Sequence, residues 1–363
     1  MKTISTPLSK LLGLRLPLVA APMAGGPTTP ELVAAASAAG ALGSFGFAYT
    51  QPEEMKKQAA AVRSKTERPF GINLFVAPQP EPIDPGAQES ALQAVARYYQ
   101  ELNLPVPEPV RAPYAPDLEA QLAAVEEIRP RVFTVHLGAL SAEKIKRFKG
   151  LRVIVGGGAT CVAEAQRLES LGFDFVIAQG GEAGGHRGTY LRDPYEALTG
   201  TLALTRLVVR AVKLPVIAAG GIMDGEGIAA VLALGAQAAQ LGTAFIPCPE
   251  SGAPQVHKDL LLKTREDDTR VTEKFSGKLA RGLVNRFMRE MQNAPQLAFP
   301  AQNSVTGKLR QASAKAGKPD FVAMWAGQAA PLARALPAAE LIARLEAEAI
   351  QAIENLKGVL HES

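Results

Sequence analysis

The chain is poor in cysteine: its 363 residues contain only Cys161 and Cys248. Two cysteines exclude a disulfide framework, and their spacing does not match a metal-binding pair, so they indicate a reducing compartment. No apolar run approaches the ~18 residues of a membrane span. Residues 1–16 also lack the apolar core of a signal peptide. We therefore expect a cytoplasmic protein without a membrane segment.

Neither sign of charge is in large excess, since the formal net charge is only +4. No dense cluster of lysine and arginine occurs, which argues against nucleic acid as a partner. The sequence contains no P-loop, no dinucleotide-binding glycine motif and no metal-spaced set of histidine, cysteine and aspartate. We therefore predict no metal site. Aromatic residues make up only 6% of the chain, whereas glycine occurs 33 times. This composition suits tight packing of helices on a sheet.

Short apolar stretches alternate regularly with helical patterns. We predict eight strands, at residues 18–23, 41–47, 70–76, 132–137, 151–158, 173–179, 214–221 and 238–245. Helices are predicted between them, at residues 29–40, 52–65, 118–128, 141–148, 161–171, 194–212 and 225–234. Strands that are apolar along their whole length indicate a parallel sheet covered on both faces. Eight such units predict an α/β fold of the (β/α)8 TIM barrel type, with a doubly wound open sheet as the alternative.

Two regions depart from this alternation. Residues 77–117 are rich in proline around one helix, at 88–102, and form an excursion from the barrel. Residues 246–320 are polar and charged, and we predict a smaller, mostly helical lid subdomain there, with helices at 254–263 and 278–292. The barrel then comprises residues 1–245 plus 321–363. The amphipathic tail at 338–356 is predicted to return as its last helix.

The most distinctive stretch is residues 177–188, which follow the sixth predicted strand and contain five glycines between 180 and 188. Such a flexible backbone can come close to a ligand. Barrels place function at the carboxyl ends of their strands, and often bind phosphate in the turns after the last two strands. Here those turns are 219–221 and 242–243. The amides of Asn73 and Gln179 can hydrogen-bond a flat heteroaromatic ring. Together these features suggest a mononucleotide cofactor.

The glycine-rich stretch carries a resemblance to a known family. Residues 177–188, together with 20–23, 70–73, 215–222, 240–245, 274–282 and 324–328, resemble the nitronate monooxygenases, formerly called 2-nitropropane dioxygenases. The resemblance spans nearly the whole chain and points to class I of the family. It implies an FMN-dependent barrel that oxidises small alkyl nitronates, such as propionate 3-nitronate. The expected products, formed with O2 and without NAD(P)H, are the carbonyl compound plus nitrite or nitrate.

The same resemblance assigns roles to individual residues. It implies that His186 is the catalytic histidine beside the flavin. The implied FMN contacts are Pro22, Met23, Asn73, Gln179, Gly184, Gly185, Gly220, Gly221, Gln240, Leu241, Gly242 and Thr243. An imidazole at this position can donate a hydrogen bond to a nitronate or remove a proton from the neutral nitroalkane. We expect His136 and Tyr114 to line the substrate pocket, and Glu182 to brace the glycine stretch.

Some choices remain open at this point. Arg281, Lys308, Arg310 and Tyr114 are unranked candidates for contacting a substrate carboxylate. The family often has tyrosine where this chain has Phe299, which leaves substrate preference undetermined. One alternative function is an FMN-dependent NAD(P)H:quinone or enoyl-acyl-carrier-protein reductase, and another is a non-catalytic sensor of a phosphoryl ligand. The expected partners are a small-molecule substrate and O2, with the chain acting as a monomer or homodimer.

Overall fold

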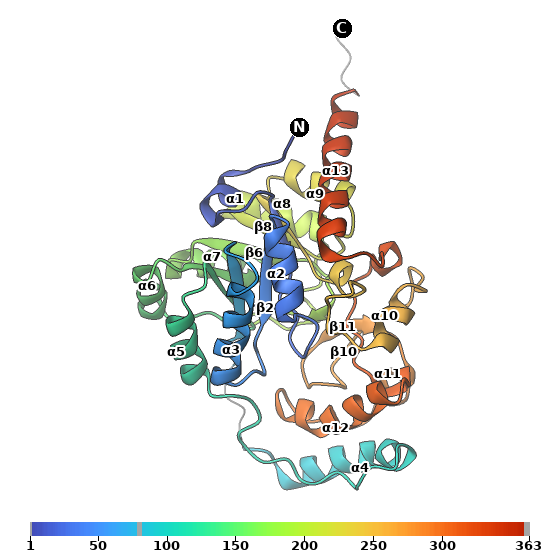
Figure 1. Cartoon of the computed structure of the whole chain (residues 1–363). Helices are drawn as coiled ribbons and strands as arrows, with labels where there is room; N and C mark the ends of the chain where they lie inside the picture. The colour runs from blue at the N-terminus through green and yellow to red at the C-terminus, as the bar shows by residue number, and fades with distance from the viewer. Residues whose placement is uncertain (1, 78–81, 359–363) are drawn as a thin grey trace.

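A closed barrel of eight parallel strands forms the centre of the computed structural model, which describes residues 2–77 and 82–358 (Figure 1). The strands are β1 (Leu18–Ala20), β2 (Leu42–Gly46), β3 (Phe70–Phe75), β4 (Val132–His136), β5 (Ile154–Ala159), β6 (Phe175–Gln179), β8 (Val216–Ala219) and β9 (Ala238–Leu241). β9 pairs in parallel with β1, with Leu18 opposite Ala239. This pairing closes the sheet, so the TIM barrel prediction is confirmed and the open sheet is excluded.

Helices cover the outside of the barrel (Figure 1). They are α2 (Pro30–Ala38), α3 (Pro52–Arg63), α5 (Leu118–Ile128), α6 (Ala142–Gly150), α7 (Val162–Leu171), α8 (Thr201–Ala211), α9 (Gly225–Ala233) and α13 (Ala338–Lys357). The sequence explains their starts: Thr29, for example, caps α2 by accepting from the backbone N–H of Leu32, and Pro30 follows it. The tail helix α13 packs against α9 and α2, as predicted.

The amino-terminal end of the barrel is plugged. Helix α1 (Pro7–Leu12) places Leu8 and Leu12, both fully buried, against interior side chains such as Phe175 and Ile217. Burial of side chains of this size is stabilising by about 1.5–3 kcal/mol each. The plug leaves the carboxyl ends of the strands as the end at which a ligand can enter.

Two segments cover the carboxyl end. Helix α4 (Pro85–Glu101), within the predicted excursion, lies beside α12 (Ala301–Lys315) at the bottom of Figure 1. Residues 246–320 also contain α10 (Gln255–Leu261), β10 (Thr269–Thr272), β11 (Ala280–Leu283), α11 (Arg286–Glu290) and the start of η2 (Pro319–Phe321). Short helices η1 (Thr243–Phe245) and η3 (Ala330–Leu332) complete the chain. The division of the chain at residue 245 stays a prediction.

Three local predictions were wrong. Residues 280–283 form strand β11 and not a helix, because they pair with β10 and with β7 (Gly185–His186) in a separate three-stranded sheet. The helix expected from residue 194 begins only at Thr201, where the Glu182 carboxylate accepts from the Thr201 N–H. Strand β9 ends at Leu241 because the 3-10 helix η1 begins two residues later. Helix α12 was not predicted at all.

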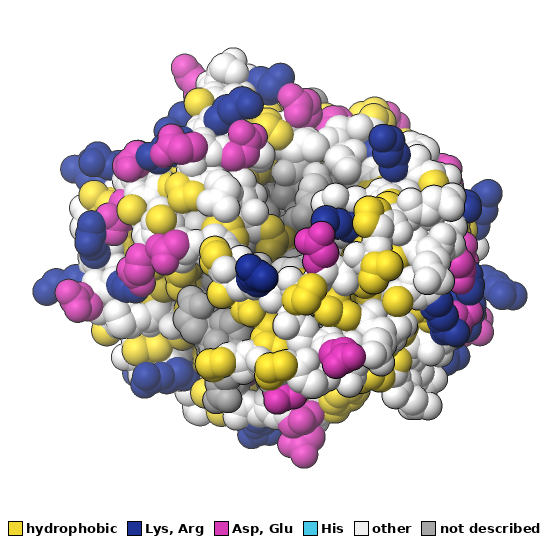
Figure 2. All heavy atoms as spheres, turned by 90° about the horizontal axis from the view of Figure 1, so that it is seen from below, with side chains coloured by type: hydrophobic (Ala, Val, Ile, Leu, Met, Phe, Trp, Pro, Cys, Tyr) yellow, Lys and Arg dark blue, Asp and Glu magenta, His cyan; other side chains and the backbone are white. Residues whose placement is uncertain are grey.

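Within residues 2–77 and 82–358, no helix is long and apolar enough to cross a bilayer. In the same residues, no three histidine, cysteine, aspartate or glutamate side chains are grouped so that they could hold a metal ion. On the face that carries α4 and α12, lysine and arginine are interspersed with aspartate and glutamate (Figure 2).

Candidate active site

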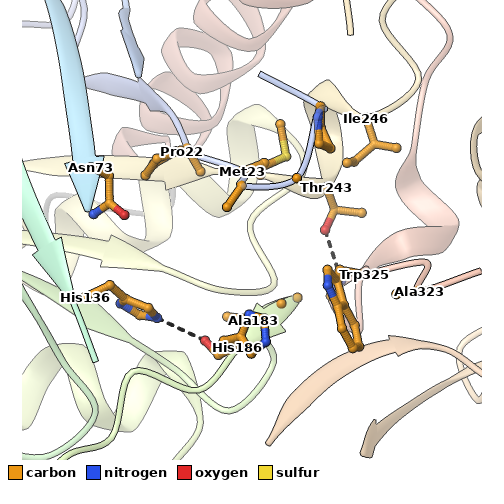
Figure 3. A pocket seen from close by; sticks show the side chains of 18 of the residues that line it. Pro22, Met23, Asn73, His136, Ala183, His186, Thr243, Ile246, Ala323 and Trp325 are labelled. Carbon is orange, nitrogen blue, oxygen red and sulfur yellow. Dashed lines mark hydrogen bonds between the residues drawn. The ribbon is translucent and has the colours of Figure 1, made fainter. Parts of the chain in front are cut away.

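A cavity of about 610 Å³ opens at the carboxyl ends of the barrel strands. Figure 3 shows His136 and Trp325 on opposite sides of it, with His186 between them and Met23 and Thr243 farther along the wall. The predicted residues that line it are Pro22, Met23, Asn73, His136, Gln179, Gly184, Gly185, His186, Gly220, Gly221, Gln240, Gly242 and Thr243. The cavity therefore gathers residues from strands far apart in the sequence.

The glycine-rich stretch is held in place by pairing. Its residues Gly185 and His186 form β7, which runs antiparallel to β11. The backbone carbonyl of His186 accepts a hydrogen bond from His136 Nε2 at 3.0 Å (Figure 3). It accepts a second from Gln179 Nε2 at 2.9 Å. A carbonyl can only accept, so His136 carries its proton on Nε2. The Gln179 Oε1 accepts from the Gly188 N–H at 2.8 Å, and both ends of this amide therefore fix the stretch.

A buried arginine supports the same stretch from behind. Arg187 has no exposed surface, and its guanidinium donates to the carbonyls of Gly180 at 2.6 Å, Gln179 at 3.0 Å and Ala197 at 2.7 Å. Burial lowers the pKa of Arg187 to about 10, so it stays protonated near neutral pH. Because one planar guanidinium binds all three carbonyls, Arg187 ties the glycine stretch to the residues before α8.

Glu182 has the bracing role expected of it. Its carboxylate accepts from the Thr201 N–H at 2.7 and 2.9 Å and from the Thr201 hydroxyl at 2.8 Å. These bonds satisfy the first backbone donor of α8, and a negative charge at a helix amino terminus is favourable. The prediction for Glu182 is confirmed.

The His186 ring lies in an aromatic box. The ring centroids of Phe75, Phe299 and Trp325 are 5.7, 5.9 and 5.6 Å from it. Its Nε2 lies 2.9 Å from the Ser276 hydroxyl. Burial, with a further contribution from nearby positive charges, lowers the pKa of His186 to about 3. It lowers the pKa of His136 to about 4, so both imidazoles are neutral at pH 7.

Backbone donors gather at the turns after β8 and β9. Within the described parts of the chain, the N–H groups of Gly221, Gly242 and Thr243 donate to no protein acceptor. Gly221 has φ +68°, a left-handed conformation that glycine adopts without strain. The Thr243 hydroxyl accepts from the Gly327 N–H at 2.9 Å and keeps its own proton for another acceptor. Unpaired donors of this kind form an anion-binding cradle.

Two of the three amides that line the cavity from the barrel strands, Asn73, Gln179 and Gln240, keep free hydrogen-bonding atoms. Asn73 donates from Nδ2 to the Thr134 hydroxyl at 2.8 Å. Its Oδ1, like the side-chain amide of Gln240, has no partner among the described residues. Gln179, in contrast, is used by the glycine stretch. Of these three, Asn73 and Gln240 are therefore the ones best able to reach a ligand.

Two predicted residues do not reach the cavity. The Leu241 side chain points into the packing between the barrel and α2, because β9 alternates its side chains between the two faces of the sheet. Tyr114 packs outside the cavity, against the apolar cluster around α4, α11 and α12.

The sequence predictions also missed several lining residues. Tyr49, Phe75 and Trp325 line the cavity, as does Asn303 of α12. Tyr49 lies two residues after the second predicted strand and Phe75 is the next-to-last residue of the third, so the strand-end rule applied to all eight strands would have found both. Trp325 lies within the family motif at 324–328. No local signal marks Asn303, because α12 itself was not predicted.

Fold and site together define a (β/α)8 barrel protein whose ligand cavity lies at the carboxyl ends of its strands, where barrel enzymes carry out chemistry. Comparison with known proteins makes this specific. The family model for nitronate monooxygenase matches residues 5–348. The chain therefore belongs to the nitronate monooxygenase family, and it is an oxidoreductase enzyme.

Individual relatives agree. A nitronate monooxygenase of Paraburkholderia phytofirmans is 42% identical over 356 residues, covering 96% of each chain. The crystal structure of a nitroalkane oxidase from Streptomyces ansochromogenes superposes with a TM-score of 0.90 at 41% identity, covering 97% of this chain and 100% of that one. FabK from Thermotoga maritima superposes with a TM-score of 0.77 at 30% identity, covering 99% and 100%.

Proposed function

We propose that the chain is an FMN-dependent nitronate monooxygenase. It oxidises alkyl nitronates such as propionate 3-nitronate with O2, giving the carbonyl compound plus nitrite or nitrate. The observation that carries the proposal is that one cavity joins the cradle of unpaired N–H groups at Gly221, Gly242 and Thr243 to the boxed imidazole of His186. Membership in the family supports the same reaction.

The residues present suit FMN. The cradle offers several donors to a phosphate, and the free Asn73 and Gln240 amides suit the polar edge of a flavin ring. A Cβ on Gly184 would lie 2.6 Å from the backbone carbon of Ala326, so glycine is needed there for the glycine-rich stretch to pack against residues 326–327. FMN, when bound, supplies a group that takes electrons from the substrate and passes them to O2.

The chain itself positions the substrate. The neutral imidazole of His186 offers a hydrogen bond to a nitronate oxygen, while the aromatic box keeps water away from it. A histidine with a pKa of about 3 is a weak base. The site is therefore better suited to a nitronate that is already an anion than to a neutral nitroalkane. We also propose that residues 246–320 act as the lid, since α12 brings Asn303 and Arg310 to the cavity.

The direct test is oxygen consumption by freshly purified, yellow protein with propionate 3-nitronate. Turnover without NAD(P)H is expected. Rapid bleaching of the flavin by NADH or NADPH without O2 would instead favour the reductase alternative. Colourless protein that gains no thermal stability from FMN would favour the sensor, since a ligand at 100 times its dissociation constant adds about 2.7 kcal/mol to stability.

A further inference from the structure

A charged side chain lines the cavity. Among its described lining residues, Arg310 of α12 is the only arginine or lysine, and there is no aspartate or glutamate. No carboxylate of the described chain lies within ion-pair distance of its guanidinium. A guanidinium in a partly closed cavity is costly without an anion beside it. Its presence needs an explanation that the protein's own side chains do not provide.

The hydrogen bonds of Arg310 leave donors unused. Its Nη2 donates to the backbone carbonyl of Asn303 at 2.9 Å and to the Asn303 Oδ1 at 2.7 Å, which directs the side chain back along α12. The Nε is buried and has no acceptor among the described residues.

A second unused donor lies in the same region. The Tyr49 hydroxyl is buried without a partner among the described residues, and burial raises its pKa to about 12, so it keeps its proton. Arg310, Tyr49 and His186 line the same cavity, and the positive charge of Arg310 contributes to the lowered pKa of His186. The Tyr49 ring also packs edge-on against Phe75, one wall of the box around His186.

We propose that Arg310 and the Tyr49 hydroxyl form a carboxylate subsite, which selects nitronates that carry a second anionic group away from the reacting carbon. The proposal rests on the proposed nitronate oxidation and adds the residues that set its substrate preference. A carboxylate there supplies the anion that the guanidinium lacks, through charge-assisted hydrogen bonds. The nitronate end of the same molecule then lies near His186.

The test compares two nitronates that differ in the carboxylate, propionate 3-nitronate and propyl-1-nitronate, by steady-state oxygen consumption. Arg310→Met removes the charge, and Tyr49→Phe removes only the hydroxyl. Lys308, also a candidate from the sequence, is exposed and does not line the cavity, so Lys308→Met is a matched control on the same helix. We expect Arg310→Met to raise KM for propionate 3-nitronate by about 10- to 100-fold, with a much smaller change for propyl-1-nitronate. Tyr49→Phe should act in the same direction, and Lys308→Met should match the parent protein.

A binding measurement separates the subsite from the reaction. Trp325 is the only tryptophan of the chain and lines the cavity, so its fluorescence can follow the binding of propionate to the holoenzyme. Weaker propionate binding in the Arg310→Met protein, with no nitronate turnover by any form, would keep the subsite and refute the proposed function. Equal losses on both nitronates, or none, would overturn the subsite. If Arg310→Met does not fold, an unchanged KM ratio in Tyr49→Phe overturns it.

Discussion

Substitution of Arg187 is the strongest test of how the glycine-rich stretch is held in place. Replacing it by methionine removes three charge-assisted hydrogen bonds to the carbonyls of Gly180, Gln179 and Ala197, each of which contributes about 1.5–3 kcal/mol. Part of that loss is offset, because a buried cation no longer has to be desolvated. The Gly180 carbonyl also keeps the N–H of Ala183 at 3.1 Å. We therefore expect a net loss of about 2–4 kcal/mol in the free energy of unfolding.

That loss converts into a measurable shift. An unfolding entropy of about 2.1 cal/mol/K per residue over 363 residues gives roughly 0.76 kcal/mol per kelvin. The melting temperature of Arg187→Met should therefore fall by about 3–5 K. Because the same carbonyls position the wall of the cavity, the variant should also retain less FMN during purification.

Two further variants sharpen the experiment. Arg187→Lys keeps the charge, but a single ammonium cannot reach three carbonyls as a planar guanidinium does, so an intermediate loss is expected. Arg192→Met, an exposed arginine of the same segment, should leave both readouts unchanged. A melting temperature and FMN content of Arg187→Met equal to those of the parent protein would refute the bracing role.

Three other outcomes follow from the site. Because His186 is a weak base, the parent protein should turn over neutral nitroalkanes more slowly than preformed nitronates. His186→Asn should keep FMN and lower turnover of the neutral compounds further, since only they need a base; equal losses in oxygen consumption would argue against even this weak base role. Burial holds the pKa of His136 near 4 and that of His186 near 3, so between pH 6.5 and these values the unfolded chain binds protons that the native chain does not. Stability is therefore complete above pH 6.5 and lost as pH falls toward 4, and a melting temperature independent of pH in this range would contradict it. Gly180→Ala should prevent folding, because its Cβ would lie 1.9 Å from the Thr201 hydroxyl, whereas Gly150→Ala, with open space around it, should melt like the parent.

The strand-end rule worked well for the site because it depends on order along the chain. Once eight apolar stretches are counted, the carboxyl end of each is known to the nearest few residues, and Asn73, His136 and Gln179 all lie there. The rule fails where a side chain's direction matters. Leu241 lies at a strand end, but its side chain packs between the barrel and the surrounding helices. Side chains alternate between the two faces of a strand, so a shift of one residue would have turned it toward the cavity.

The lid was the least predictable region. Strand β11 is short, and it pairs with residues about 95 positions earlier in the chain, at Ala280 opposite His186. No local periodicity records such a pairing, since it depends on contacts that exist only after the barrel has formed. Helix α12 was missed for a related reason: it contains Gly307 and several polar residues, and its stability comes from apolar packing beneath the barrel.

The sequence by itself determined the barrel, through the number and apolar character of its strands, and located the cavity through the ends of those strands. It also marked residues 177–188 as the part of the wall that must come close to a ligand, because glycine lacks a Cβ whatever its neighbours are. The tertiary structure alone decided the rest. It turned that flexible stretch into a paired strand, made His136 and His186 neutral by burying them, and left Arg310 in the cavity without a carboxylate. Each of these depends on what surrounds a side chain, and residues distant in sequence supply those surroundings.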